Sequence, residues 1–153
     1  MTTTARLWSA ASLLLLLSCY HGTRTHPLPG ALRATSTRSV REIAAAALAT
    51  LNGHGISVEQ YRPDTGLVES AWFDIMNLDP RAQNYPADER EVRFRFLAVA
   101  DPAGGPTHLY LEVVQHGVDP LGSRFREREV PSDHPAMAVA RGLLIRLTER
   151  LGS

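Results

Sequence analysis

The sequence predicts an α+β protein: an antiparallel sheet of four or five strands, with an N-terminal and a C-terminal helix packed on one face. Apolar residues recur at helical spacing over residues 39–53 and again over 134–151, and segments between them alternate apolar and polar residues. Because short turns join these segments, the strands should run antiparallel. Helices at both ends would then cover one sheet face in two layers.

The first helix should begin at Ser39, because residues 39–42 have the S-x-x-E form of a capping box. It should end at Asn52-Gly53, where the glycine would take the left-handed conformation. Its apolar stripe consists of Val40, Ile43, Ala44, Ala47, Leu48 and Leu51.

A hairpin should follow this helix. Residues 56–61 alternate, and residues 62–66 form a turn in which Pro63 pre-sets its dihedral and Gly66 tolerates positive φ. Residues 67–75 return as the second strand. Its facing stays open, because two sets of side chains compete for the inner face: Val68 and Trp72 against Ala71, Phe73 and Ile75.

A second hairpin lies beyond a polar stretch at residues 76–91, which the composition predicts to be a long loop. Residues 92–98 alternate clearly, and one face of this strand consists of Val92, Phe94, Phe96 and Ala98. Residues 101–106 form a Pro- and Gly-rich turn, and residues 108–116 return. The inward side chains of the return strand are Leu109, Leu111 and Val113, and the outward ones are His108, Tyr110 and Glu112.

The end of the chain should hold the second helix. Within residues 123–130, arginines at 124, 126 and 128 alternate with Phe125, Glu127 and Glu129, which leaves open a short edge strand protected by its charges. Asp133 is the expected N-cap, with Pro135 in the first turn. One apolar stripe then runs through Met137, Ala140, Leu144, Leu147 and Leu151.

An apolar run at the start of the chain predicts an export signal. Arg6 precedes residues 7–17, which are too short to span a bilayer but suit a secretory signal. The run closes on Leu16-Leu17-Ser18-Cys19, and Cys19 is the single cysteine of the chain. This stretch resembles the lipobox of bacterial lipoproteins. The resemblance implies that residues 1–18 are removed and that Cys19 is lipidated; simple secretion and a cytosolic start remain the alternatives.

The same resemblance predicts a location. Tyr20 rather than Asp follows the cysteine, which in such lipoproteins implies the outer membrane, facing the periplasm. Residues 19–38 are rich in Thr, Arg, Gly and Pro, so we expect a lipidated cysteine followed by a flexible tether. A single α+β domain would then occupy residues 39–153.

Charge and composition exclude one partner class. All 16 basic residues are arginine, and 16 acidic residues balance them. A nucleic-acid partner calls for a basic excess, which this chain lacks. The expected partners are therefore the membrane, through the lipid anchor, and another envelope protein.

The sequence carries no catalytic, cofactor or metal signature. His108 and His116 would share a strand face, but eight residues of strand separate them by roughly 26 Å. Ser132, Asp133 and His134 are residue types of a hydrolase triad, yet neighbours in sequence cannot adopt its geometry, and a helix cap explains them better.

Two groups of residues are candidates for a partner surface. Arg93 and Arg95, with Arg124 and Arg126, would form an anion-binding face if the last strand pairs nearby; the alternative is surface charge paired with Glu127 and Glu129. Trp72 and Tyr85 would mark a recognition patch around the long loop; the alternative places Trp72 on a packed strand face.

The turn at residues 63–68 and the flanking helices resemble the helix-grip domains of accessory lipoproteins in barrel-assembly machinery. The anchor, the tether and the absence of a catalytic set predict a non-catalytic binding or scaffold domain. Two alternatives stay open. A small-ligand or lipid carrier would need a cavity of about 300 Å³ or more, and an envelope hydrolase would need a cleft that holds a perturbed histidine or carboxylate.

Overall fold

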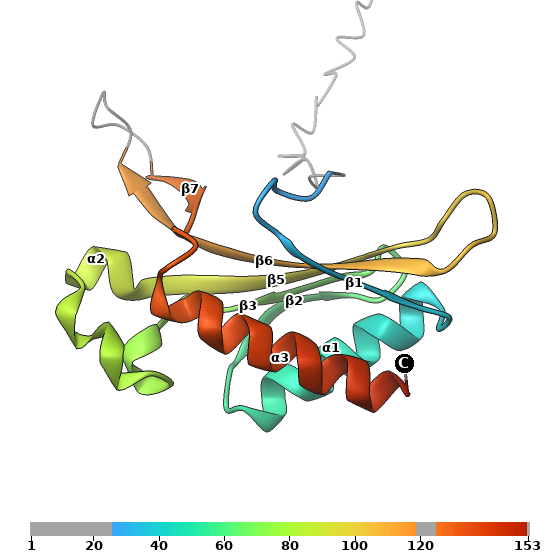
Figure 1. Ribbon diagram of the computed structural model, residues 1–153, viewed down its shortest axis with the longest axis horizontal. Coiled ribbons are helices and arrows are strands. Elements are labelled where there is room, and N and C mark those ends of the chain that lie inside the picture. Colours follow the sequence, from blue (N-terminus) through green and yellow to red (C-terminus); the bar gives the residue numbers. More distant parts are fainter. Residues whose placement is uncertain (1–25, 119–124, 153) are drawn as a thin grey trace, which may run out of the picture.

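The computed structural model of the chain describes residues 26–118 and 125–152. It has two layers: an antiparallel sheet of seven strands, and the helices α1 and α3, which lie together on one sheet face (Figure 1). The predicted α+β class and the placement of both helices are therefore confirmed. The sheet has more strands than the four or five expected.

The elements follow one another as β1 (Leu32–Ser36), α1 (Val40–Gly53), β2 (Val58–Arg62), β3 (Leu67–Ser70), β4 (Phe73–Asp74), the 3₁₀ turns η1 (Ile75–Asn77) and η2 (Pro80–Asn84), α2 (Ala87–Arg90), β5 (Glu91–Val99), β6 (Thr107–Val118), β7 (Phe125–Glu129) and α3 (Pro135–Leu151). The strand order is β1-β6-β5-β3-β2, with β4 beside β5 and β7 beside β6. β1 pairs with residues 107–111 of β6 and β7 with residues 114–118, so these two strands share one sheet edge.

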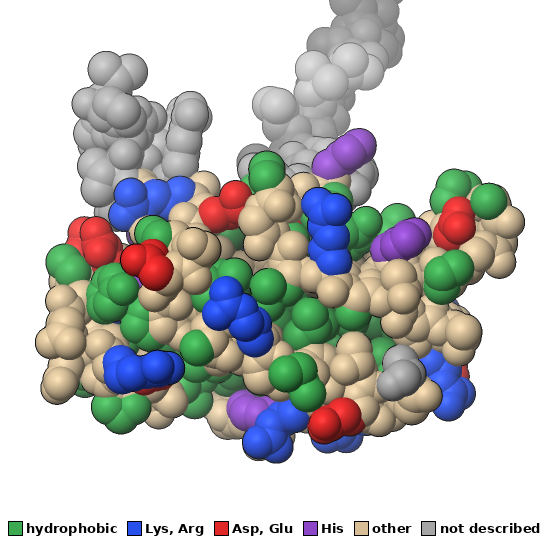
Figure 2. Space-filling model, in the orientation of Figure 1, with side chains coloured by type: hydrophobic (Ala, Val, Ile, Leu, Met, Phe, Trp, Pro, Cys, Tyr) green, Lys and Arg blue, Asp and Glu red, His purple; other side chains and the backbone are tan. Residues whose placement is uncertain are grey.

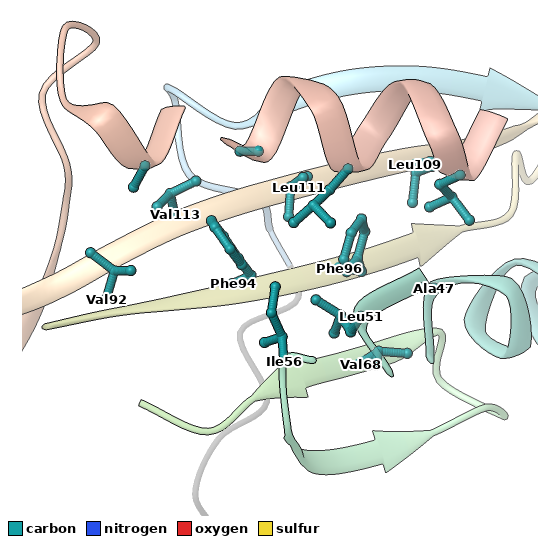
Figure 3. Close-up of a cluster of buried hydrophobic side chains, with 14 of the residues drawn as sticks. Ala47, Leu51, Ile56, Val68, Val92, Phe94, Phe96, Leu109, Leu111 and Val113 are labelled. Atoms are coloured by element: carbon teal, nitrogen blue, oxygen red, sulfur yellow. The ribbon is translucent and has the colours of Figure 1, made fainter. Parts of the chain in front are cut away.

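The core lies between the sheet and the two helices. Alternation along β5 and β6 directs one set of side chains toward the helices, where α1 contributes Ala47 and Leu51 (Figure 3). Phe94 and Phe96 are the largest of the fully buried side chains. Burying a side chain of this size contributes about 1.5–3 kcal/mol. The predicted inward set is found here: Val92, Phe94, Phe96, Ala98, Leu109, Leu111 and Val113.

Local signals place the helix ends, with two corrections. The capping box at Ser39 and Glu42 forms as predicted. Gly53 is still helical, and the glycine with positive φ is Gly55. The N-cap of α3 is His134 rather than Asp133, because Pro135 is the first helical residue and the cap is the residue before it.

The predicted tether is wrong over its last part. Residues 32–36 form β1, which pairs antiparallel with β6, and Leu28 and Gly30 donate hydrogen bonds to side chains of the sheet. The folded domain therefore begins well before residue 39. Residues 19–25, the other part of that segment, lie outside the described residues.

Three further segments of the structure differ in detail from the predicted elements or complete them. The strand expected at residues 67–75 divides into β3 and β4, with Ala71 and Trp72 between them. The long loop contains η1, η2 and α2. The edge strand left open at residues 123–130 is present as β7. Among the described residues, no helix is long and apolar enough to cross a bilayer.

Candidate functional site on the outer face of the sheet

The sheet face opposite the helices carries a cluster of charged side chains, here named the outer-face cluster. Alternation along β5 turns Arg93 and Arg95 away from the core, and β3 and β6 present Glu69 and Glu112 beside them. Its members are Glu59, Glu69, Arg93, Arg95, Glu112 and Glu127.

Arg93 is held by carboxylates on two sides. Its guanidinium hydrogen-bonds to Glu69 of β3 and to Glu59 of β2, and its Nη1 lies 3.5 Å from Glu127 Oε1 of β7. Glu59 reaches Arg93 at the point where the β2–β3 register shifts between Val58 and Gln60. Only 10% of the Arg93 side chain is exposed.

Arg95 joins three further strands. Its guanidinium donates to Glu69, to Glu112 Oε2 at 3.1 Å and to Glu127 Oε2 at 2.7 Å. Burial would lower the pKa of Arg95, but the hydrogen bonds to Glu127 and Glu69 outweigh burial and raise that pKa above its ordinary value. Arg95 is therefore a fixed cation that ties β3, β6 and β7 together.

Trp72 covers part of this cluster. Its ring stacks on His116 with 3.8 Å between centroids, and the Arg93 guanidinium lies 4.6 Å from the Trp72 ring centre. The division between β3 and β4 lets Trp72 fold over the outer face, while Phe73, one residue on, packs against Phe94 in the core. Val68 of one competing set and Phe73 and Ile75 of the other therefore all face the core, and Trp72 does not.

The N-terminal segment closes over the same face. Leu28 N–H donates to Glu112 Oε1 at 2.8 Å, and Gly30 N–H donates to Glu129 Oε1 at 2.8 Å. Glu112 thus accepts from both the segment and Arg95, and only 1% of its side chain is exposed. We call residues 26–31 the N-terminal clasp. Figure 1 shows it on the side of the sheet opposite the helices.

The charge balance decides what this face can bind. Four glutamates surround two arginines, a formal charge of −2, and both guanidiniums are occupied by carboxylates. The self-paired alternative therefore describes Arg93 and Arg95 better than an anion-binding face. Arg126 belongs to β7, with its backbone opposite Gly117. Arg124 lies outside the described residues.

Tyr85 lies in a different part of the fold from Trp72. It packs edge-on against His134, with 4.8 Å between ring centroids. His134 is buried at the start of α3, where its Nδ1 accepts from Ala136 N–H at 3.1 Å and its Nε2 lies 3.1 Å from the Glu89 carbonyl oxygen. Burial lowers the pKa of His134, and the Glu89 carbonyl partly offsets that effect. Both ring nitrogens are engaged by the backbone, so this histidine is structural.

A polar groove lies on the helix layer, between the C-terminal parts of α1 and α3. It is open to solvent, has a volume of about 420 Å³ and is lined by Thr50, Gly53, His54, Arg146, Glu149 and Arg150. The space between sheet and helices is instead occupied by the continuous apolar cluster of the core. Within residues 26–118 and 125–152, no three His, Cys, Asp or Glu side chains gather as a metal site requires.

Sequence reasoning found Arg93 and Arg95 but missed most of their partners. Alternation alone places Glu112 on the outward face of its strand, and the same rule places Glu69 there. The missing information was the register, which sets Arg95 opposite both Glu69 and Glu112.

Neither the scan against protein-family models nor the comparison with curated proteins finds a match for this chain.

Proposed function

We propose that this chain is a cell-envelope lipoprotein, anchored through Cys19, whose folded domain binds another envelope protein as a scaffold or assembly subunit. The observation that carries the proposal is the leucine run that closes on Cys19, nine residues before the clasped residue Leu28. The clasp begins seven residues after that cysteine, and Leu28 and Gly30 within it are hydrogen-bonded to side chains of the sheet.

The clasp supports an orientation for the anchored domain. Nine residues reach at most about 32 Å, and they lead from Cys19 to the outer face of the sheet, where Leu28 is hydrogen-bonded to Glu112. The outer face would therefore lie toward the membrane. The helix layer, on the opposite side of the sheet, would face the aqueous space and any partner there (Figure 1).

The contacts of the described residues favour binding over the two alternatives. The perturbed histidine expected of a hydrolase is His134, whose nitrogens serve the backbone at a helix start. A carrier would need its cavity between sheet and helices, where Phe94, Phe96 and their neighbours fill the space. The groove between α1 and α3 is open and lined by polar and charged residues, which suits a protein segment better than a lipid chain.

The test is the intact mass and membrane fractionation of the expressed protein beside a Cys19→Ala variant. We expect the wild type to lose residues 1–18, gain acyl mass and sediment with membranes, whereas the variant gains none. Ser18→Ala is the matched control, because it alters the same stretch but keeps the cysteine and should still be lipidated. A wild type that is soluble and unmodified would refute the anchor.

A further inference from the structure

We propose that the polar groove between α1 and α3 binds an acidic segment of the partner protein through Arg146 and Arg150. The proposal rests on the proposed function, which places the helix layer on the side away from the membrane. In Figure 2, charged side chains and histidine gather at the lower rim of the molecule, where the helices lie. This groove is separate from the outer-face cluster.

The two arginines are available to a ligand. In the described part of the chain, Arg38 and Arg41 are paired with Glu42 and Asp64, but no ion pair engages Arg146 or Arg150. Both arginines are exposed and line the groove. A guanidinium binds a carboxylate through two parallel hydrogen bonds, so each arginine can take one acidic side chain.

The spacing of the arginines indicates the form of the ligand. Arg146 and Arg150 are four residues apart on α3, which places their Cα atoms about 6 Å apart along the helix. Alternate side chains of an extended peptide lie about 6.6 Å apart along the strand. An extended segment with acidic residues at alternate positions therefore matches both guanidiniums.

The remaining charges favour a short acidic segment over a polyanion. Glu149 lines the same groove and offsets one arginine, so the positive potential is local. Arg150 has a competing structural role, because it lies in the last turn of α3 and complements the helix dipole there. Arg146 lies before that last turn, where the dipole effect has faded, so the helix dipole does not account for it.

Gly53 provides a way to fill the groove without damaging the fold. It lines the groove, it is helical, and a Cβ built on it meets no atom within 4 Å. Gly53→Glu would place a carboxylate beside the arginines and compete with an acidic ligand. Gly53→Gln adds nearly the same bulk without the charge and is the matched control.

The experiment measures fluorescence anisotropy of a dye-labelled peptide of alternating Glu and Ser, titrated with the full chain in detergent micelles. A peptide with Gln in place of Glu is the ligand control. We expect the Arg146→Ala/Arg150→Ala double variant to weaken binding about tenfold and Gly53→Glu at least about fivefold. Gly53→Gln and Arg141→Ala, on the same helix but outside the groove, should stay within about twofold.

Several outcomes would overturn the proposal. Equal binding of the Glu and Gln peptides would remove the role of charge, and an equal loss in Arg141→Ala would remove the role of the groove. Weakened folding of the double variant with unchanged peptide binding would assign the arginines to helix stability. Binding of vesicles of anionic phospholipid that is lost in the double variant would assign the groove to a bilayer. A wild type that is found to be unlipidated but still binds the peptide would refute the anchor alone and leave the groove standing.

Discussion

Replacing Glu112 and Glu127 in turn should show how much burial adds to the stability that a hydrogen bond between charged side chains provides. Glu112 and Glu127 both accept a hydrogen bond from Arg95, at 3.1 and 2.7 Å. They differ in exposure, because 1% of the Glu112 side chain and 34% of the Glu127 side chain is accessible. Alanine at each position removes one hydrogen bond of Arg95 in a different environment; Glu112→Ala also removes the acceptor of Leu28 N–H, and Glu127→Ala the contact with Arg93.

The two losses should differ several-fold. Glu112→Ala removes acceptors from Arg95 and from Leu28 N–H. Each bond to a charged acceptor is worth about 1.5–3 kcal/mol. Arg95 keeps Glu69 and Glu127, so the lower end applies and we expect a loss of about 3 kcal/mol. Glu127→Ala breaks an exposed pair, for which we expect about 0.2–1 kcal/mol.

The assay is thermal unfolding of the purified full chain, followed by circular dichroism. For a domain of this size, 1 kcal/mol shifts the melting temperature by about 4 °C. The expected decreases are therefore about 12 °C for Glu112→Ala and at most about 4 °C for Glu127→Ala. Equal decreases would refute the reasoning that burial sets the value of these bonds.

Hydrogen exchange provides a second readout for the clasp. The Leu28 amide should be protected in the wild type, because its N–H is bonded to Glu112. Glu112→Ala should abolish that protection. Glu112→Gln keeps a neutral acceptor, so it should retain the protection while lowering stability. A Leu28 amide that stays protected in Glu112→Ala would show that another group holds the clasp.

Three further predictions concern local features. Burial lowers the pKa of His134, so the fold favours the neutral form of this side chain. The stability of the fold should therefore decrease as the pH drops below the unfolded pKa of about 6.5. His134→Asn keeps an acceptor for the helix cap, and it should flatten a series of melting temperatures measured from pH 7.5 to 5. Gly66→Ala combines positive φ with overlap on the Ala98 carbonyl and should lower the unfolding free energy in urea by about 3 kcal/mol or more, whereas Gly104→Ala, in open space, should cost only about 1. Hydrogen bonds from Ser39 lower the pKa of Glu42, so the stability advantage over Glu42→Gln should be present above about pH 4.3 and should vanish in melts at lower pH.

Local chemistry made the helices predictable. The capping box at Ser39 involves four consecutive residues, so its geometry is encoded where it forms. The misplaced N-cap of α3 follows from choosing Asp133 for its intrinsic preference. Pro135 carried the better signal, because proline favours the first helical position and the cap is then the residue before it.

Pairing between distant residues explains what sequence reasoning missed. Residues 32–36 are rich in small and polar residues and resemble a linker, and they become a strand only because β6, far along the chain, supplies the ladder. The same holds for the outer-face cluster, where Arg95 meets Glu112 through the register of β5 and β6. Alternation assigns each side chain to a face but does not say which side chains are opposite.

The strand β1, which the sequence did not predict, affects the proposed function more than the register of β5 and β6 does. A tether that ended at residue 38 would let the domain range up to about 65 Å from Cys19. Because the clasp begins at residue 26, the seven residues that lead there from Cys19 reach at most about 25 Å. A lipidated Cys19 would therefore hold the outer face close to the bilayer, where a protein partner has little room. Under the proposed anchor, the helix layer with its arginine-lined groove is the surface that such a partner can reach.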